Sequence, residues 1–282
     1  MKYFRKSLYA LTFLLLTGCG GLADMAYNNA PNYVAGEIDD AFDLDPAQSD
    51  QLDNRLEQFF VWHRNEELMR YQQFLDRAAL AAADGISATE VLGLRDEVFV
   101  AWNRALDKAI DSLGDLAVSL SDEQIERFER YYRERSEEFH DYLEKSEQQR
   151  EIYRVNRAYK RLENWFGEFD YPLDDRIHER LRQIPDIYRP WFEFRQRRHK
   201  ALIAALRNAS TKGFDQSQLR RILVDPDSDH ARAFAPAREA YWQAYATALE
   251  DISSWMSDQQ RQRVVSRLQK YARIVERLRG QG

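Results

Sequence analysis

The stretch LSDEQIERFERYY, residues 120–132, carries a helix start followed by a helical face. The hydroxyl of Ser121 can accept a hydrogen bond from a backbone N–H of the first turn, and Gln124, three residues on, can reach back to the backbone of Ser121. The apolar residues that follow are spaced three and four apart and fall on one helix face: Ile125, Phe128 and Tyr132. The stretch therefore predicts a capped amphipathic helix.

The same helix-start box, with Asp or Ser followed three residues later by Gln or Glu, occurs four more times in the chain. These boxes lie at residues 44–48, 86–90, 214–218 and 256–260. An apolar stripe at helical spacing follows each box, further stripes cover residues 153–169 and 187–206, and no stretch alternates as a strand does. We therefore expect an all-α fold, an elongated multi-helix bundle of seven to nine helices.

One polar stretch leaves two interpretations open. EKSEQQRE, residues 144–151, could be a break between two helices or an exposed extension of one. A seam near residues 168–186 could also divide the bundle.

The composition is that of a folded protein with a substantial core. Of the 282 residues 44% are hydrophobic and 31% charged, and the low numbers of Gly (11) and Pro (7) disfavour a turn-dense β-sandwich or barrel. The net charge is −6, and loss of residues 1–18, with three basic and no acidic residues, would make it −9. This balance argues against nucleic acid as a partner, because binding to phosphates needs a basic surplus.

The N-terminus MKYFRKSLYALTFLLLTGC, residues 1–19, has the pattern of a secretory signal. Three basic residues precede an apolar run, residues 8–16, that is too short to span a bilayer. The sequence LTGC, residues 16–19, then matches a lipobox, in which small residues let an extended backbone enter a peptidase groove. The resemblance to bacterial lipoprotein precursors implies cleavage before Cys19 and acylation of this residue.

Cys19 is the single cysteine of the chain, so its acylation would leave no thiol for a disulfide, for catalysis or for a metal. Three acyl chains would anchor the protein permanently in a membrane. Lipoproteins with Asp after the lipidated Cys tend to stay in the inner membrane, and this chain has Gly20 there. The resemblance thus implies the outer membrane, with the body of the protein on the periplasmic side.

These observations divide the chain into three parts. We expect a lipoprotein signal peptide over residues 1–18, a lipidated N-terminus and tether over 19–36, and the helical bundle domain over 37–282. The tether, which is small and polar, would hold at most one short helix.

Several motifs spread along the chain resemble an uncharacterised family of proteobacterial lipoproteins, domain of unknown function 6279. The motifs are Tyr27-Asn28-Asn29-Ala30, Asp39-Asp40-Ala41-Phe42-Asp43-Leu44, Trp62-His63-Arg64, Glu67-Leu68, Tyr71, Phe74-Leu75, Leu120–Gln124 and Trp165-Phe166-Gly167. The resemblance implies fold and location and no activity. The helix-start boxes are also similar to the Leu-Thr-x-x-Gln starts of Spy- and CpxP-type periplasmic chaperones, although Thr is replaced here by Asp or Ser.

Five polar residues fall in the apolar stripes and are the candidate functional residues: His63, Glu67, Arg135, Arg195 and His199. They could line a cleft that holds an anionic or sugar-like group. They could instead form a buried ion-pair network. The arginines among them could also extend to the surface at the edge of a stripe.

No catalytic motif is present. A Gly-rich phosphate loop, a Ser nucleophile elbow and a His-Glu-x-x-His helix are all missing from the sequence. Glu137-x-x-His140 is a single di-iron half-motif where two are needed, so we expect neither a metal nor a cofactor. The sequence favours a non-enzymatic module that binds or scaffolds an envelope protein or polymer. The alternatives are a periplasmic chaperone-like protein and an enzyme acting on an envelope polymer.

Overall fold

The computed structural model describes residues 20–281, and Cys19, the lipobox and the signal peptide lie outside them. The described part consists of helices joined by turns and short loops and contains no strand, which confirms the all-α expectation. Its elements are α2 Gly20–Asn28, α3 Ala30–Phe42, α4 Pro46–Trp62, the π-helical turn η1 His63–Glu67, α5 Leu68–Ala83, α6 Ala88–Ser119, α7 Asp122–Glu144, α8 Glu147–Phe166, α9 Leu173–Arg182, α10 Tyr188–Lys212, α11 Gln216–Leu223, α12 Asp229–Trp255 and α13 Asp258–Arg279.

The described residues form twelve α-helices where seven to nine were expected. The excess comes from short helices without a long apolar stripe, such as α9, and from residues 20–36, where at most one short helix was expected. The single stripe expected from residue 52 to residue 78 is split by η1 into α4 and α5.

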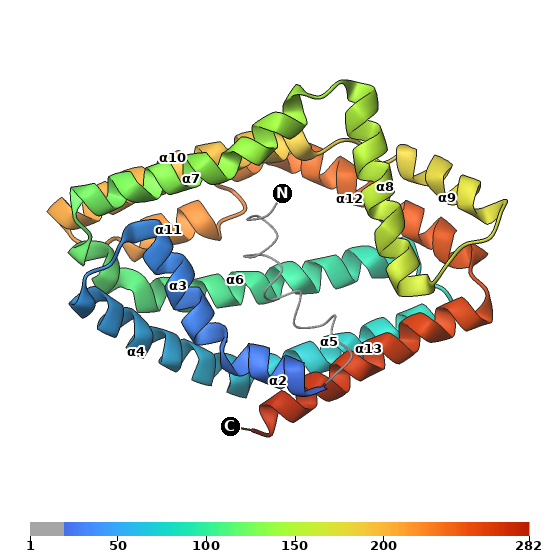
Figure 1. The fold of residues 1–282 in the computed structure, drawn as a ribbon, viewed down its shortest axis with the longest axis horizontal. Coiled ribbons are helices and arrows are strands. Elements are labelled where there is room, and N and C mark those ends of the chain that lie inside the picture. Colours follow the sequence, from blue (N-terminus) through green and yellow to red (C-terminus); the bar gives the residue numbers. More distant parts are fainter. Residues whose placement is uncertain (1–19, 282) are drawn as a thin grey trace.

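The helices are arranged around α6, which runs along the middle of the elongated molecule (Figure 1). Helix α6 contacts α4, α5, α10, α11 and α12. Helices α7 and α10 lie along one side, while α5 and α13 lie side by side along the other. At one end α3 connects α4 to α7, and at the other α8 packs on α9 and α13.

The hydrophobic core is a series of clusters between neighbouring helices. One cluster joins α2, α5 and α13, a second joins α8, α9 and α12, and a third joins α6, α7 and α10. Each centres on side chains that are almost or fully inaccessible, such as Ile125 and Ile252 (both 0% exposed). An elongated fold of this kind buries apolar surface locally, pair by pair, as the amphipathic stripes predict.

The helix-start boxes cap helices as predicted. At Ser121 the hydroxyl accepts from Gln124 N, and the Gln124 side chain accepts from Ser121 N at 2.9 Å. The same reciprocal arrangement starts α4, α6 and α13, and Asp215 caps α11 by accepting from two backbone amides.

A further box resolves the polar stretch at residues 144–151 as a break. Helix α7 ends at Glu144, and Ser146 caps α8 by accepting from Gln149 N while the Gln149 side chain accepts from Ser146 N. The next turn, between α8 and α9, contains the cis Tyr171–Pro172 bond and lies at the edge of the suggested seam.

Residues 20–36 form α2 and the first part of α3, where the sequence predicted a tether with at most one short helix. Ala23, Tyr27 and Ala30 recur at spacings of four and three residues and are all buried, at 1%, 6% and 8% exposure. Ala23 and Tyr27 pack into the cluster formed with α5 and α13. The small alanines let the backbone of α2 approach its neighbours, so a short polar-looking segment gains enough buried surface to fold.

Among residues 20–281, no helix combines the length and the apolar character needed to cross a membrane.

Candidate functional site

The site begins at the π-helical turn η1, where α4 continues into α5. A π-turn inserts one extra residue into a helix, which shifts the face presented by everything after it, and such turns are frequent at functional sites. Here the turn directs His63 and Glu67 into the protein, where they are 7% and 0% exposed. Arg64 and Asn65, on the same turn, line a surface groove.

Glu67 is a fully buried carboxylate held by two arginines. Arg104 from α6 donates from Nε to Oε1 and from Nη2 to Oε2, both at 2.8 Å, and Arg70 donates to Oε1 from one turn along α5. Burial alone would raise the pKa of the Glu67 carboxyl, but the hydrogen bonds and charges of both arginines outweigh it and lower this pKa below its ordinary value. Glu67 is therefore a paired anion at neutral pH.

His63 sits in an aromatic cage beside this carboxylate. The Nδ1 atom of His63 is 2.9 Å from Oη of Tyr27, and the rings of Phe59, Phe60 and Tyr71 lie 5.4 to 6.1 Å from the imidazole centre. Burial lowers the pKa of His63 to about 4, partly opposed by the charge of Glu67. The imidazole is thus neutral at pH 7, and its Nδ1 can accept a hydrogen bond from the Tyr27 hydroxyl when the ring proton is on Nε2.

Arg135 lies in a different interface. Its Nη2 is 3.1 Å from a carboxylate oxygen of Glu37, which ties α7 to α3, and its guanidinium carbon stands 4.3 Å from the centre of the Tyr131 ring. This is a partly exposed ion pair between two helices.

Arg195 and His199 form a third cluster, between α10 and α7. The imidazole of His199 stacks on the ring of Tyr132 at 3.6 Å between centres and 6° between planes. The Arg195 guanidinium lies within 5.4 Å of the centres of three rings: Tyr132, Phe139 and Trp191. Burial lowers the pKa of His199 to about 4 and also lowers the pKa of Arg195.

The five candidate residues therefore occupy three different helix interfaces. The structure brings His63 together with Glu67, and Arg195 together with His199, and it places Arg135 apart with Glu37. Among the residues described, no three His, Cys, Asp or Glu side chains are grouped as ligands of a metal ion would be.

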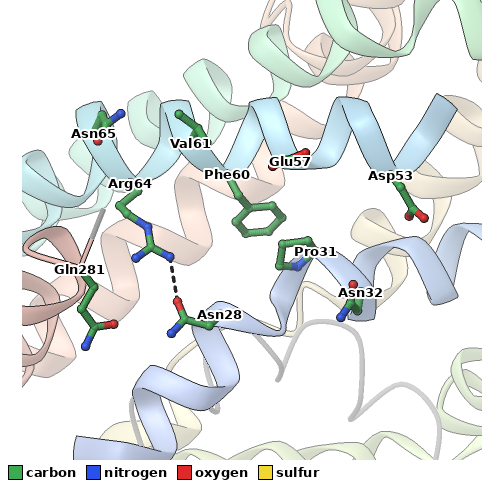
Figure 2. Close-up of a pocket in the computed structure, with 10 residues that line it drawn as sticks. All are labelled: Asn28, Pro31, Asn32, Asp53, Glu57, Phe60, Val61, Arg64, Asn65 and Gln281. Carbon is green, nitrogen blue, oxygen red and sulfur yellow. Dashed lines mark hydrogen bonds between the residues drawn. The ribbon is translucent and has the colours of Figure 1, made fainter. Parts of the chain in front are cut away.

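A groove of about 610 Å³ opens directly outside the buried pair, between the elbow joining α2 to α3 and the helix α4–η1 (Figure 2). Phe60 and Pro31 face each other across its floor. The remaining lining residues are polar or lie at the rim: Asn28, Asn32, Asp53, Glu57, Val61, Arg64, Asn65 and Gln281.

Arg64 is fixed at one end of this groove. It donates from Nη2 to Oδ1 of Asn28 at 2.8 Å and from Nη1 to the backbone oxygen of Leu278 at 3.3 Å, and it lies 5.1 Å from the centre of the Tyr27 ring. Asp53 and Glu57 stand one helical turn apart further along α4. Among the described residues, none of these three charged groups has an ion-pair partner.

The sequence did not point to this groove. None of the five candidate residues lines it, and Asp53 and Glu57 fall on the polar face of α4, where they read as ordinary surface charges. The groove exists because α3 packs on α4 and the elbow between α2 and α3 faces the helix α4–η1, an arrangement that helical spacing does not predict. The one signal was the presence of Asn28 and Arg64 within motifs that carry the family resemblance.

Comparisons with known proteins give one match. The family of unknown function DUF6279 matches residues 40–234, from the end of α3 to the start of α12. No curated protein and no solved structure matches the chain. Since the match spans well over half of the sequence, the chain belongs to the family of unknown function DUF6279.

Proposed function

We propose that this protein is a lipid-anchored lipoprotein of the outer membrane whose helical domain, on the periplasmic side, binds another envelope component without catalysing a reaction. The observation that carries this proposal is a contrast between two adjoining sites. The buried carboxylate of Glu67 is saturated by Arg104 and Arg70, whereas the neighbouring groove keeps charged groups that have no ion-pair partner among the described residues.

The buried cluster is poorly suited to general acid–base work. A catalytic acid or base needs a pKa near the working pH and access to a substrate proton. The pKa of His63 is lowered to about 4, the pKa of Glu67 is lowered below its ordinary value, and both side chains are buried. This disfavours an enzyme that acts on an envelope polymer through His63 and Glu67.

The position of the groove suits an anchored binding protein. Helix α2 starts at Gly20, next to the expected lipidation site, and ends at Asn28 on the groove wall. Nine helical residues extend over about 13 Å, so a molecule in the groove would be held close to the anchored end of the domain.

Anchoring is tested by growing cells with an alkyne-bearing fatty acid and isolating the protein. The wild-type chain should carry the label and fractionate with the outer membrane, and the Cys19→Ser variant should carry none. A Gly20→Asp variant should be labelled and move to the inner-membrane fraction. Label on the Cys19→Ser variant would rule out acylation at this residue.

Binding is tested with a photoreactive side chain introduced at Asn32, which lines the groove, or at Glu126 on the outer face of α7 as a control. Irradiation of intact cells should give a discrete adduct from position 32 and not from position 126. Equal adduct patterns from both positions would count against the groove as the binding site.

A second candidate function, that of a chaperone for unfolded periplasmic proteins, is favoured by an apolar surface on α6. Val98, Phe99 and Trp102 are 51%, 40% and 48% exposed and share one side of the helix. Exposed apolar patches bind partners or unfolded segments. The protein in lipid nanodiscs should then suppress aggregation of an unfolded client, and a variant with Ser at all three positions should not. Equal suppression by both would exclude the patch as the client site.

A further inference from the structure

We infer that the groove binds a short extended peptide by both of its charged ends, with the free amino group at Asp53 and Glu57 and the free carboxylate at Arg64. This inference rests on the proposed binding function and names the chemical class of the ligand. Three features of the groove carry it: unpaired acidic groups, a fixed guanidinium and the distance between them.

The acidic end consists of two carboxylates that no described residue neutralises. Asp53 and Glu57 are exposed on consecutive turns of α4, where like charges repel one another. The arginine between them in sequence, Arg55, pairs instead with Asp115 of α6 at 2.6 Å. An ammonium group from a ligand would remove the repulsion and supply the missing counter-charge.

The basic end is the guanidinium of Arg64, which, among the described residues, is held in place by neutral acceptors only. Asn28 and the backbone oxygen of Leu278 accept two of the hydrogen bonds of Arg64, and no described residue supplies a counter-ion for its charge. A guanidinium carries five N–H donors, so donors remain for an incoming carboxylate. Because Arg64 is already oriented, little side-chain entropy is lost when the ligand binds.

The spacing of the two ends sets the length of the ligand. Glu57 and Arg64 are seven residues apart and Asp53 and Arg64 are eleven, which corresponds to about 10 and 16 Å along the helix axis. An extended peptide advances about 3.3–3.6 Å per residue, so about three to five residues span this distance. A phosphoethanolamine head group has only two carbons between its charges and cannot reach both ends.

The walls of the groove fit a peptide backbone. Phe60 and Pro31 provide an apolar floor for small side chains, and the amides of Asn32, Asn65 and Gln281 at the walls both donate and accept hydrogen bonds. A neutral sugar could use the amides, but it would leave the charges at both ends of the groove unmatched. The charges therefore favour a peptide with free ends.

The test is calorimetric titration of the full mature protein in detergent with tetra-alanine whose two ends are free. The same peptide with an acetylated N-terminus, or with an amidated C-terminus, should bind at least tenfold more weakly. Equal binding of the free and capped peptides, or no binding of tri-, tetra- and penta-alanine, would overturn the inference.

Variants assign each end of the ligand. In Asp53→Asn/Glu57→Gln, binding of the free peptide should weaken to that of the acetylated peptide, and acetylation should have no further effect. Arg64→Gln should remove discrimination at the C-terminus only. The two acidic positions are exposed, so their variant should fold normally. If the Arg64→Gln variant melts early, Arg64→Lys is the variant that tests the basic end. Arg77→Gln, in an exposed ion pair on α5, is the matched control and should change neither preference.

The same experiments separate this inference from the proposed function. If maltotetraose binds in the groove and tetra-alanine does not, the ligand class is wrong while the binding function stands. If neither probe binds and the photoreactive group at position 32 gives no adduct, both are wrong.

Discussion

Glu67 on the π-helical turn and Arg104 on α6 form a bidentate ion pair in which Nε and Nη2 of Arg104 are each 2.8 Å from a different oxygen of the Glu67 carboxylate. The Glu67 side chain is completely buried and the Arg104 side chain is 34% exposed. The pair connects the long helix α4–η1–α5 to the central helix α6. It also fixes the turn whose other face carries Arg64, so the interior ion pair holds one wall of the groove in position.

Breaking this pair is expected to be strongly destabilising. Arg104→Ala would leave Glu67 buried with only the more exposed Arg70 as partner, and loss of one member of a buried pair removes about 3–5 kcal/mol from the free energy of unfolding. Urea unfolding followed by circular dichroism measures this change. Arg77→Ala, which breaks an exposed pair with Glu97, is the control and should remove at most about 1 kcal/mol. Similar losses of unfolding free energy in the two variants would show that the buried pair contributes no more to stability than the exposed pair.

His63 should make the stability depend on pH between about 6.5 and about 4. Burial lowers the pKa of His63 in the folded state from 6.5 to about 4. Below pH 6.5 the unfolded chain therefore takes up a proton that the folded chain does not bind until the pH approaches 4. Stability is therefore full above pH 6.5 and decreases as the pH falls, by about 3 kcal/mol once the pH is below about 4. His199 has a pKa shifted in the same direction and adds to the effect.

The measurement is the free energy of unfolding in urea at several pH values from 7.5 to 4. A His63→Phe variant keeps an aromatic ring in the cage and cannot be protonated, so its stability should fall less steeply over this range. His140→Gln, at an exposed position on α7, should follow the wild-type curve. Parallel curves for His63→Phe and the wild type would exclude His63 as the source of the dependence.

The cap at Ser146 should stabilise the start of α8 to the same extent as the caps that the sequence predicted. Ser146→Ala removes the acceptor for Gln149 N and should lower the free energy of unfolding by about 1 kcal/mol. Ser121→Ala should give a similar loss at α7. Thr247→Ala, in the middle of α12, is the control, because its hydroxyl only bonds a carbonyl of its own helix. A loss at position 146 no larger than at position 247 would mean that the cap contributes nothing.

The sequence predicted what is local, and it failed where distant segments meet. Ser121 and Gln124 are three residues apart, so their reciprocal hydrogen bonds could be read directly from the spacing. Ser146 and Gln149 carry the same signal, which the strongly polar surroundings masked. Tyr27 could not be placed in this way, because its partner His63 is 36 positions further along the chain.

The candidate site shows the same limit. Helical spacing placed His63 and Glu67 in the apolar stripe of one helix, and both are buried. Both residues belong to the π-helical turn, and the partners that they bind, Tyr27 and Arg104, come from other helices, which helical spacing could not reveal. Asp53 and Glu57 became candidates only once the elbow between α2 and α3 was seen to cover α4.

Two glycines of α6 allow packing to be separated from helix propensity. A Cβ added to Gly114 would lie 2.7 Å from a ring carbon of Phe214, whereas a Cβ added to Gly93 meets nothing within 4 Å. Both positions are within one helix, so replacement by Ala gains about 0.5–1 kcal/mol of helix propensity in each case. At position 114 the new methyl group must push the Phe214 ring out of the cluster formed by α6, α7 and α10, which costs about 1–3 kcal/mol.

We therefore expect Gly93→Ala to raise the melting temperature and Gly114→Ala to lower it. Because both substitutions are made in the same helix, melting-temperature changes of opposite sign would identify the close approach of Phe214 to Gly114 as the cause of the difference. Phe214→Leu, which shortens the side chain next to Gly114, should reduce the penalty of Gly114→Ala in the double variant. Stabilisation by Gly114→Ala alone would mean that the loop carrying Phe214 yields without cost, and that α6 does not depend on this contact.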